Sequence, residues 1–109
     1  MTRYLFQASY TSEAWAVQVS NPQNRVEAIR SVIERLGGRL ESAYVSFGDY
    51  DVVDITEMPD SISAAAFSLA TSAGGAFKAI KTTPLLTAEE GMEAMNKAAG
   101  AGYRPPGRQ

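Results

Sequence analysis

The sequence contains neither cysteine nor histidine, and these two absences exclude whole classes of chemistry. Without cysteine, disulfides, thiolate nucleophiles, iron–sulfur clusters and thiolate zinc sites are excluded. Without histidine, the chain lacks the commonest metal ligand, the usual haem ligand and the side chain that titrates most easily near neutral pH. A metal site would need Asp and Glu oxygens alone, and no dense acidic cluster is visible. We therefore expect no metal and no cofactor.

Long apolar runs and an excess of positive charge are also absent. No stretch of about 18 apolar residues occurs, so the sequence predicts no membrane span. The net charge is −2 and the 10 Lys and Arg residues are scattered, which argues against a nucleic-acid partner. The chain enters Tyr4-Leu5-Phe6 directly, without a basic start and a long apolar core. We therefore expect no signal peptide and a cytoplasmic location.

The composition that remains is that of an ordinary small globular domain. The 109 residues are 45% hydrophobic and 20% charged, which suits one domain with a modest core. We expect this domain over residues 1–98 and a flexible tail over residues 99–109, where glycines and prolines gather.

Hydrophobic periodicity and capping residues predict an alternation of strands and helices. Strands are expected at 3–10, 39–47, 50–58 and 76–86. Helices are expected after Thr11 as far as Ser20, from Pro22 to about Leu36, over about 60–73, and from Thr87 to about Lys97. Gly48-Asp49 is predicted to form a tight hairpin turn with positive φ angles, so that Gly48→Val should be destabilising.

This order of elements predicts a ferredoxin-like α+β fold. The expected sheet is antiparallel with four strands, of which the first and third are central, and both main helices cover one face. A further helix follows at the C-terminal end. The opposite face is left bare, and two bare faces can bury each other in a two-fold dimer that resembles a barrel. We therefore expect a homodimer formed through the open sheet face.

A Gly-x-Tyr-Asp motif precedes the third strand, and other short motifs surround it at fixed spacing. The residues concerned are Leu36-Gly37-Gly38, Gly48, Tyr50, Asp51, Val52-Val53, Pro59-Asp60 and Thr82-Thr83. On these residues the chain resembles the GYD domain family, in the dimeric α/β-barrel group of ferredoxin-like proteins, over about residues 2–95. The resemblance implies the fold and dimerisation but little about activity. Asp54 departs from the family pattern, which more often has an aliphatic or small residue there.

Asp54 is the leading candidate for a binding residue, because an aliphatic side chain would be the default on a central strand. If Val53 and Ile55 face the helices, Asp54 points to the open face. Desolvation would raise its pKa there unless a cation pairs with it. The residues that could share that face and line a small-molecule pocket are Gln7, Ser9, Tyr44, Ser46, Tyr50, Lys81 and Thr83. The alternative is a buried polar network, such as an Asp54–Lys81 ion pair, that sets the dimer register.

Three further residues have mainly structural interpretations. Tyr50 is expected to pack against a neighbour on the sheet, and Asp51 to accept hydrogen bonds from turn amides. Trp15 is expected to pack near the end of a strand, with the wall of a cavity as the alternative.

Three functions remain open at this point. The first is a dimeric domain that binds or senses a small molecule. The second is a cofactor-independent monooxygenase or isomerase acting on a small aromatic or polyketide-like compound, an interpretation that rests on fold analogy. The third is an assembly module without a ligand. An enclosed pocket lined by Asp54, Tyr44 and Lys81 would favour the first two, and turnover of a bound compound would separate the second from the first.

Overall fold

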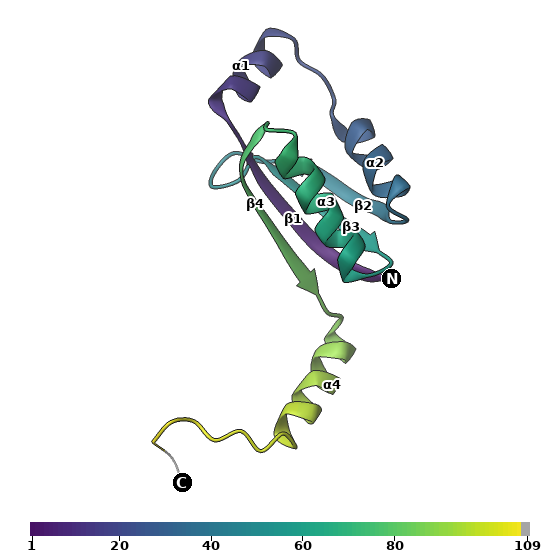
Figure 1. Ribbon diagram of the computed structural model, residues 1–109, viewed down its shortest axis with the longest axis vertical. Coiled ribbons are helices and arrows are strands. Elements are labelled where there is room, and N and C mark those ends of the chain that lie inside the picture. Colours follow the sequence, from purple (N-terminus) through teal and green to yellow (C-terminus); the bar gives the residue numbers. More distant parts are fainter. Residues whose placement is uncertain (108–109) are drawn as a thin grey trace.

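The computed structural model describes residues 1–107 and shows an α+β fold built on one four-stranded sheet (Figure 1). Residues 108 and 109, the end of the predicted tail, lie outside the described residues. The elements are, in chain order, β1 (Thr2–Tyr10), α1 (Ser12–Ser20), α2 (Val26–Arg35), β2 (Arg39–Val45), β3 (Val52–Met58), α3 (Ser61–Ala73), β4 (Phe77–Leu85) and α4 (Ala88–Ala99). None of the helices in residues 1–107 has an apolar segment of the length that a membrane span requires.

The sheet has the strand order β2-β3-β1-β4, and every neighbouring pair is antiparallel. β1 and β3 are therefore central, as predicted. α2 and α3 lie over the same face of the sheet (Figure 1). None of the described helices covers the opposite face, which we call the open face. This arrangement confirms the ferredoxin-like fold class.

The hydrophobic core lies between the sheet and these two helices. The inward side chains of β1 include Tyr4, Phe6 and Tyr10, all of them buried. The ring of Phe6 packs on that of Phe67 in α3, with 4.8 Å between the ring centroids. Ile33 of α2 is fully buried beside them. The aromatic side of β1 therefore faces the helices.

α2 begins later than its sequence predicts. The helix starts at Val26, not at Pro22, and the amide of Val26 donates to the side chain of Asn24. The apolar stripe of the helix also begins at Val26, so residues 21–25 have no core contact that would hold them in a helical turn. They instead form an irregular connection between α1 and α2.

The hairpin between β2 and β3 also differs from its prediction. The amide of Ser46 donates to the carbonyl of Asp51 at 2.8 Å, which leaves a four-residue loop in place of a two-residue turn. Positive φ angles occur at Gly37, Gly75, Gly102 and Gly107 among the described residues, and not at Gly48. The loop is anchored to β1, because the amide of Asp51 donates to the carbonyl of Ala8. The prediction of a positive φ angle at Gly48, and of the backbone strain that Gly48→Val would cause, is therefore wrong.

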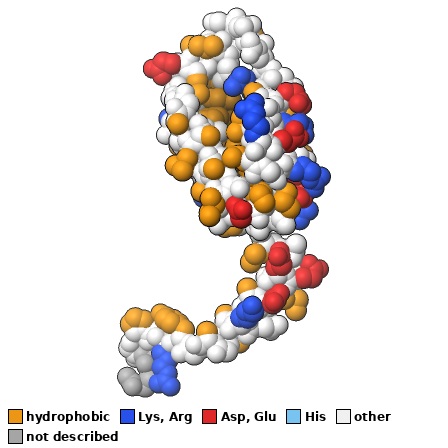
Figure 2. Space-filling view, turned by 45° about the vertical axis from the view of Figure 1, so that its right-hand side comes forward, with side chains coloured by type: hydrophobic (Ala, Val, Ile, Leu, Met, Phe, Trp, Pro, Cys, Tyr) orange, Lys and Arg blue, Asp and Glu red, His pale blue; other side chains and the backbone are white. Residues whose placement is uncertain are grey.

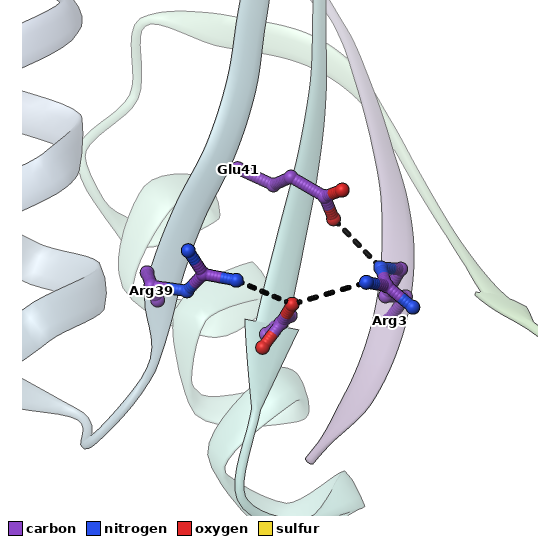
Figure 3. Close-up of polar contacts among 4 residues, drawn as sticks. Arg3, Arg39 and Glu41 are labelled. Atoms are coloured by element: carbon purple, nitrogen blue, oxygen red, sulfur yellow. Dashed lines mark hydrogen bonds and ion pairs between the residues drawn. The ribbon is translucent and has the colours of Figure 1, made fainter.

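The open face is apolar in its middle and charged at one end. Leu5 of β1 lies opposite Ile55 of β3 in the middle. At the end, Glu57 accepts a hydrogen bond from Arg39 at 2.7 Å and lies 3.4 Å from Arg3 (Figure 3). Arg3 also donates to Glu41 at 2.7 Å. Glu41 reaches this face because the β2–β3 register shifts between Leu40 and Ser42, as in a β-bulge.

Candidate functional site

A cleft opens in the helix layer between α1, the 21–25 connection, α2 and the sheet. Its volume is about 670 Å³, and we call it the Asp54 cleft. A neighbouring hollow of about 500 Å³ lies between α1, α2 and α3 and shares Tyr10, Arg25 and Ile29 with it. Figure 2 shows a hollow in the upper part of the molecule, surrounded by hydrophobic side chains. The irregular connection at 21–25 is what leaves this part of the sheet uncovered.

The lining of the Asp54 cleft is mostly apolar, and its polar and charged members are Gln18, Gln23, Asn24, Arg25 and Asp54. Ile29 and Val52 supply aliphatic surface, and Tyr10 and Trp15 supply aromatic surface. The rings of Tyr10 and Trp15 pack edge to face, with 5.1 Å between their centroids. Apolar walls with a few placed polar groups are typical of small-molecule sites.

Asp54 is the buried polar group of this cleft. It sits in the middle of β3, opposite Phe6 of β1 and Ala43 of β2, and only 1% of its surface is exposed. Neither carboxylate oxygen has a hydrogen-bond partner among the described residues. Burial without a compensating partner raises the pKa of Asp54 to about 6. Such an unpartnered carboxylate is unusual, because buried polar groups are nearly always hydrogen-bonded.

The predicted burial of Asp54 is confirmed. The prediction that its side chain points to the open face is wrong. Residues that lie directly opposite each other in an antiparallel sheet point to the same side. Because Asp54 lies opposite Phe6, it faces the helices, and Val53 and Ile55 face the open side. The apolar character of Val53 and Ile55 suggested the reverse.

The other predicted pocket residues divide between two places. Tyr44, Val53, Gln7 and Lys81 form one row across the open face. The structure therefore places Gln7, Tyr44 and Lys81 on one face, with Tyr44 and Lys81 on its two outer strands, and this face is the one away from Asp54. An Asp54–Lys81 ion pair is excluded. Tyr44, on the edge strand, also contributes to the lining of the Asp54 cleft.

The β2–β3 hairpin loop and its surroundings contain Tyr50, Ser46 and Ser9, whereas Thr83 lies on the open face. Tyr50 is half-buried in this loop and not on β3, and its carbonyl accepts from the hydroxyl of Ser46 at 2.7 Å. Ser9 is buried and donates to the carbonyl of Asp49 at 2.7 Å. Both serines therefore hold the loop and do not line the cleft.

Asp51, the last residue of the Gly-x-Tyr-Asp motif, shapes the cleft indirectly. One of its carboxylate oxygens accepts from the amide of Tyr10 at 2.9 Å and from the indole of Trp15 at 3.2 Å. The sequence suggested that Asp51 accepts from amides of the turn, but the backbone amide that it binds lies in β1. By fixing the end of β1 and the side chain of Trp15, Asp51 positions two residues of the cleft lining.

Tyr10 and Arg25 also line the cleft, and sequence reasoning did not select either as a site residue. Burial raises the pKa of Tyr10, the nearby positive charge of Arg25 lowers it, and the charge of Asp54 adds to the increase. Arg25 forms no ion pair with the described residues. The sequence suggested only that Arg25 lies on the solvated side of the helix expected from Pro22 to about Leu36. The cleft thus offers a carboxylate, a phenol, a cation and three side-chain amides in a largely apolar lining.

Comparison with known proteins is consistent with this fold. The family model of the GYD domain matches residues 4–95. This range runs from β1 into α4 and includes every residue of the Asp54 cleft. No curated protein matches the chain.

Proposed function

This chain belongs to the GYD domain family, and we propose that it is a small-molecule-binding domain whose ligand occupies the Asp54 cleft. The single observation that carries the proposal is a fully buried carboxylate without a partner in the lining of a cleft of about 670 Å³. That volume lies within the range of about 300–1,000 Å³ that is usual for ligand sites. A ligand that donates a hydrogen bond to Asp54 would remove the cost of its isolation.

The lining defines the chemistry of the ligand. An ionised carboxylate only accepts hydrogen bonds, so the ligand needs a hydroxyl, an N–H group or a protonated amine at Asp54. The rest of the ligand should be apolar, because Trp15, Ile29 and Val52 would surround it. An aromatic or small aliphatic ring with one donor group meets both requirements.

Two probes that differ only in the donor group test this proposal. Benzyl alcohol should bind wild-type protein at least about 10-fold more tightly than toluene, which is the value of one hydrogen bond to a charged group. Asp54→Val should remove that preference, because the acceptor is gone while the apolar walls remain. The indole N–H resonance of Trp15, the single tryptophan, reports binding in NMR titrations.

Lys81→Ala is the matched control for this titration, since Lys81 lies on the open face and was the alternative pocket residue. It should leave both affinities unchanged. Equal affinities of the two probes for wild-type protein, or no response at Trp15, would contradict a ligand site at Asp54.

A proton-transfer enzyme is the second candidate, and the raised pKa of Asp54 is the observation that favours it. A carboxylate with a pKa of about 6 can take a proton from a carbon next to a carbonyl and return it to another carbon. That step needs no oxidant, so it favours an isomerase over a monooxygenase. Exchange of solvent deuterium into a bound ketone, lost in Asp54→Asn, would distinguish an enzyme from a binding domain.

We also propose that the chain forms a homodimer through the open face. The apolar residues Leu5, Val53 and Ile55 of this face are covered by none of the described helices. Pairing of two such faces would bury them in the manner of packed sheets. Light scattering after size exclusion should give about twice 11.7 kDa at micromolar concentration, and a mass of one chain would contradict the dimer.

A further inference from the structure

α4 leaves the domain without packing against it. Figure 1 shows the helix beyond the end of β4, pointing away from the sheet. Every residue of α4 is exposed except Gly91, which is half-buried. The exposed fractions of two of its apolar side chains, Met92 and Met95, are 62% and 66%. An apolar helix surface of this kind normally has a partner.

The overall dimensions of the chain also indicate that α4 lacks a packing partner. Its accessible surface is 7644 Å², whereas a compact protein of this mass exposes about 5,900 Å². Its radius of gyration is 17.6 Å, whereas a compact domain of this length has about 13 Å. The difference in area, about 1,700 Å², comes from α4 together with the exposed residues 100–107, and it exceeds the ~800 Å² that each partner buries in a typical stable interface.

The sequence of α4 defines one apolar stripe. Ala88, Met92, Met95 and Ala99 follow at intervals of four, three and four residues, which places them on one side of the helix. Glu89, Glu90 and Glu93 lie off this stripe. Isolated helices shorter than about 12–15 residues are marginal in water. A helix of 12 residues with this pattern is therefore stable only when the stripe is packed.

The base of α4 adjoins the open face. Arg3, on the open face, lies opposite Leu85, the last residue of β4. Only Leu86 and Thr87 connect β4 to α4, and the reciprocal hydrogen bonds of Thr87 and Glu90 fix the start of the helix. A chain bound to the open face would therefore lie within reach of α4.

We infer that α4 docks through its Met92–Met95 stripe onto a second copy of this chain, so that two copies exchange these helices. The inference rests on the proposed homodimer and extends its interface from the open face to α4. At about 1.5 Å per residue the helix is about 18 Å long, and the outer strands of a four-stranded sheet lie about 14 Å apart. Packed sheets lie about 10 Å apart, so each α4 is long enough to extend from its own sheet past that of its partner.

Methionine methyl groups provide a direct test, because the chain has only four methionines. A sample mixed from chains labelled with ¹³C at the methionine methyls and unlabelled chains separates contacts within a chain from contacts between chains. Isotope-filtered NOEs should connect Met92 and Met95 to protons of the other chain. Met58, which is 1% exposed in the core, should show contacts within its own chain only.

The solution mass separates this inference from the proposed dimer. A dimer in which Met92 and Met95 contact only their own chain, or no chain, overturns the docking of α4 and leaves the dimer standing. A monomer overturns both. Neither result bears on the Asp54 cleft.

The double variant Met92→Glu/Met95→Glu should raise the dissociation constant of the dimer at least about 10-fold, because it places two charges in the packed stripe. Glu93→Gln, on the same helix but off the stripe, is the matched control and should leave the constant unchanged. An unchanged Met58 methyl shift shows that the variant domain is folded. An unchanged dissociation constant in the folded double variant overturns the inference.

Discussion

Replacement of Asp54 by valine is expected to stabilise the fold by about 3 kcal/mol at pH 8. The pKa of this carboxyl rises from 3.8 to about 6 on folding, and each unit corresponds to about 1.4 kcal/mol. The folded state therefore carries the cost of an ionised carboxylate without a partner. Valine removes that cost, favours a β-strand and adds one apolar side chain to the cleft lining.

The pH dependence of the effect follows from the direction of the shift. A carboxyl whose pKa is higher in the folded state is fully penalised above about pH 6 and not penalised below about pH 4. The stability difference between Asp54→Val and wild type should therefore shrink as the pH falls from 8 to 4. Urea unfolding of both proteins at these two pH values measures it.

Asp49→Asn is the control for this comparison, because Asp49 is an exposed carboxylate in the hairpin loop. Its replacement should change stability by less than about 0.5 kcal/mol at either pH. If Asp54→Val were no more stable than wild type at pH 8, Asp54 would have a partner in solution.

Gly38→Val is expected to destabilise the fold by about 3 kcal/mol or more. A Cβ atom at Gly38 would lie 2.5 Å from the carbonyl oxygen of Glu57 and 2.5 Å from the sulfur of Met58. The carbonyl belongs to β3 and cannot move without disturbing the β2–β3 pairing. Overpacking of this kind costs about 1–3 kcal/mol, and more where backbone must shift.

Gly48→Val is the matched substitution, since an added Cβ at Gly48 meets nothing within 4 Å. It should change stability by less than about 0.5 kcal/mol. Thermal unfolding midpoints of the two variants decide the comparison, and equal midpoints would mean that the close approach at Gly38 does not exist in solution.

The order of the elements could be predicted from sequence because local chemistry determines it. Asp60 accepts from the amide of Ser63 at the start of α3, and Thr87 and Glu90 form the expected capping box at the start of α4. Such signals act over three residues and do not depend on the rest of the fold. The ferredoxin-like topology then follows from the order of these elements.

The side of the sheet that Asp54 faces could not be predicted from local signals of this kind. Alternation separates Val52, Asp54 and Thr56 from Val53 and Ile55, but it does not say which set the helices cover. The register with β1 decides this, because Phe6 lies opposite Asp54 and packs on Phe67. That contact joins residues far apart in the sequence.

The cleft itself could not be predicted from the sequence either. It exists because residues 21–25 do not continue α2, although Asn21-Pro22 resembles a helix start. Arg25 reaches the lining of the cleft only through this irregular path. A local signal thus pointed to a helix, and the lack of core contacts for these residues decided otherwise.

The titration of the Asp54 side-chain carboxyl carbon by NMR, with and without benzyl alcohol, tests most directly whether this residue is the acceptor of a ligand site. In the free protein the midpoint should lie at about pH 6. A ligand that donates a hydrogen bond to the ionised carboxylate favours the charged form, so benzyl alcohol should lower that midpoint. A midpoint near 4 in the free protein, or a midpoint that does not move when benzyl alcohol is added, would contradict a ligand site at Asp54.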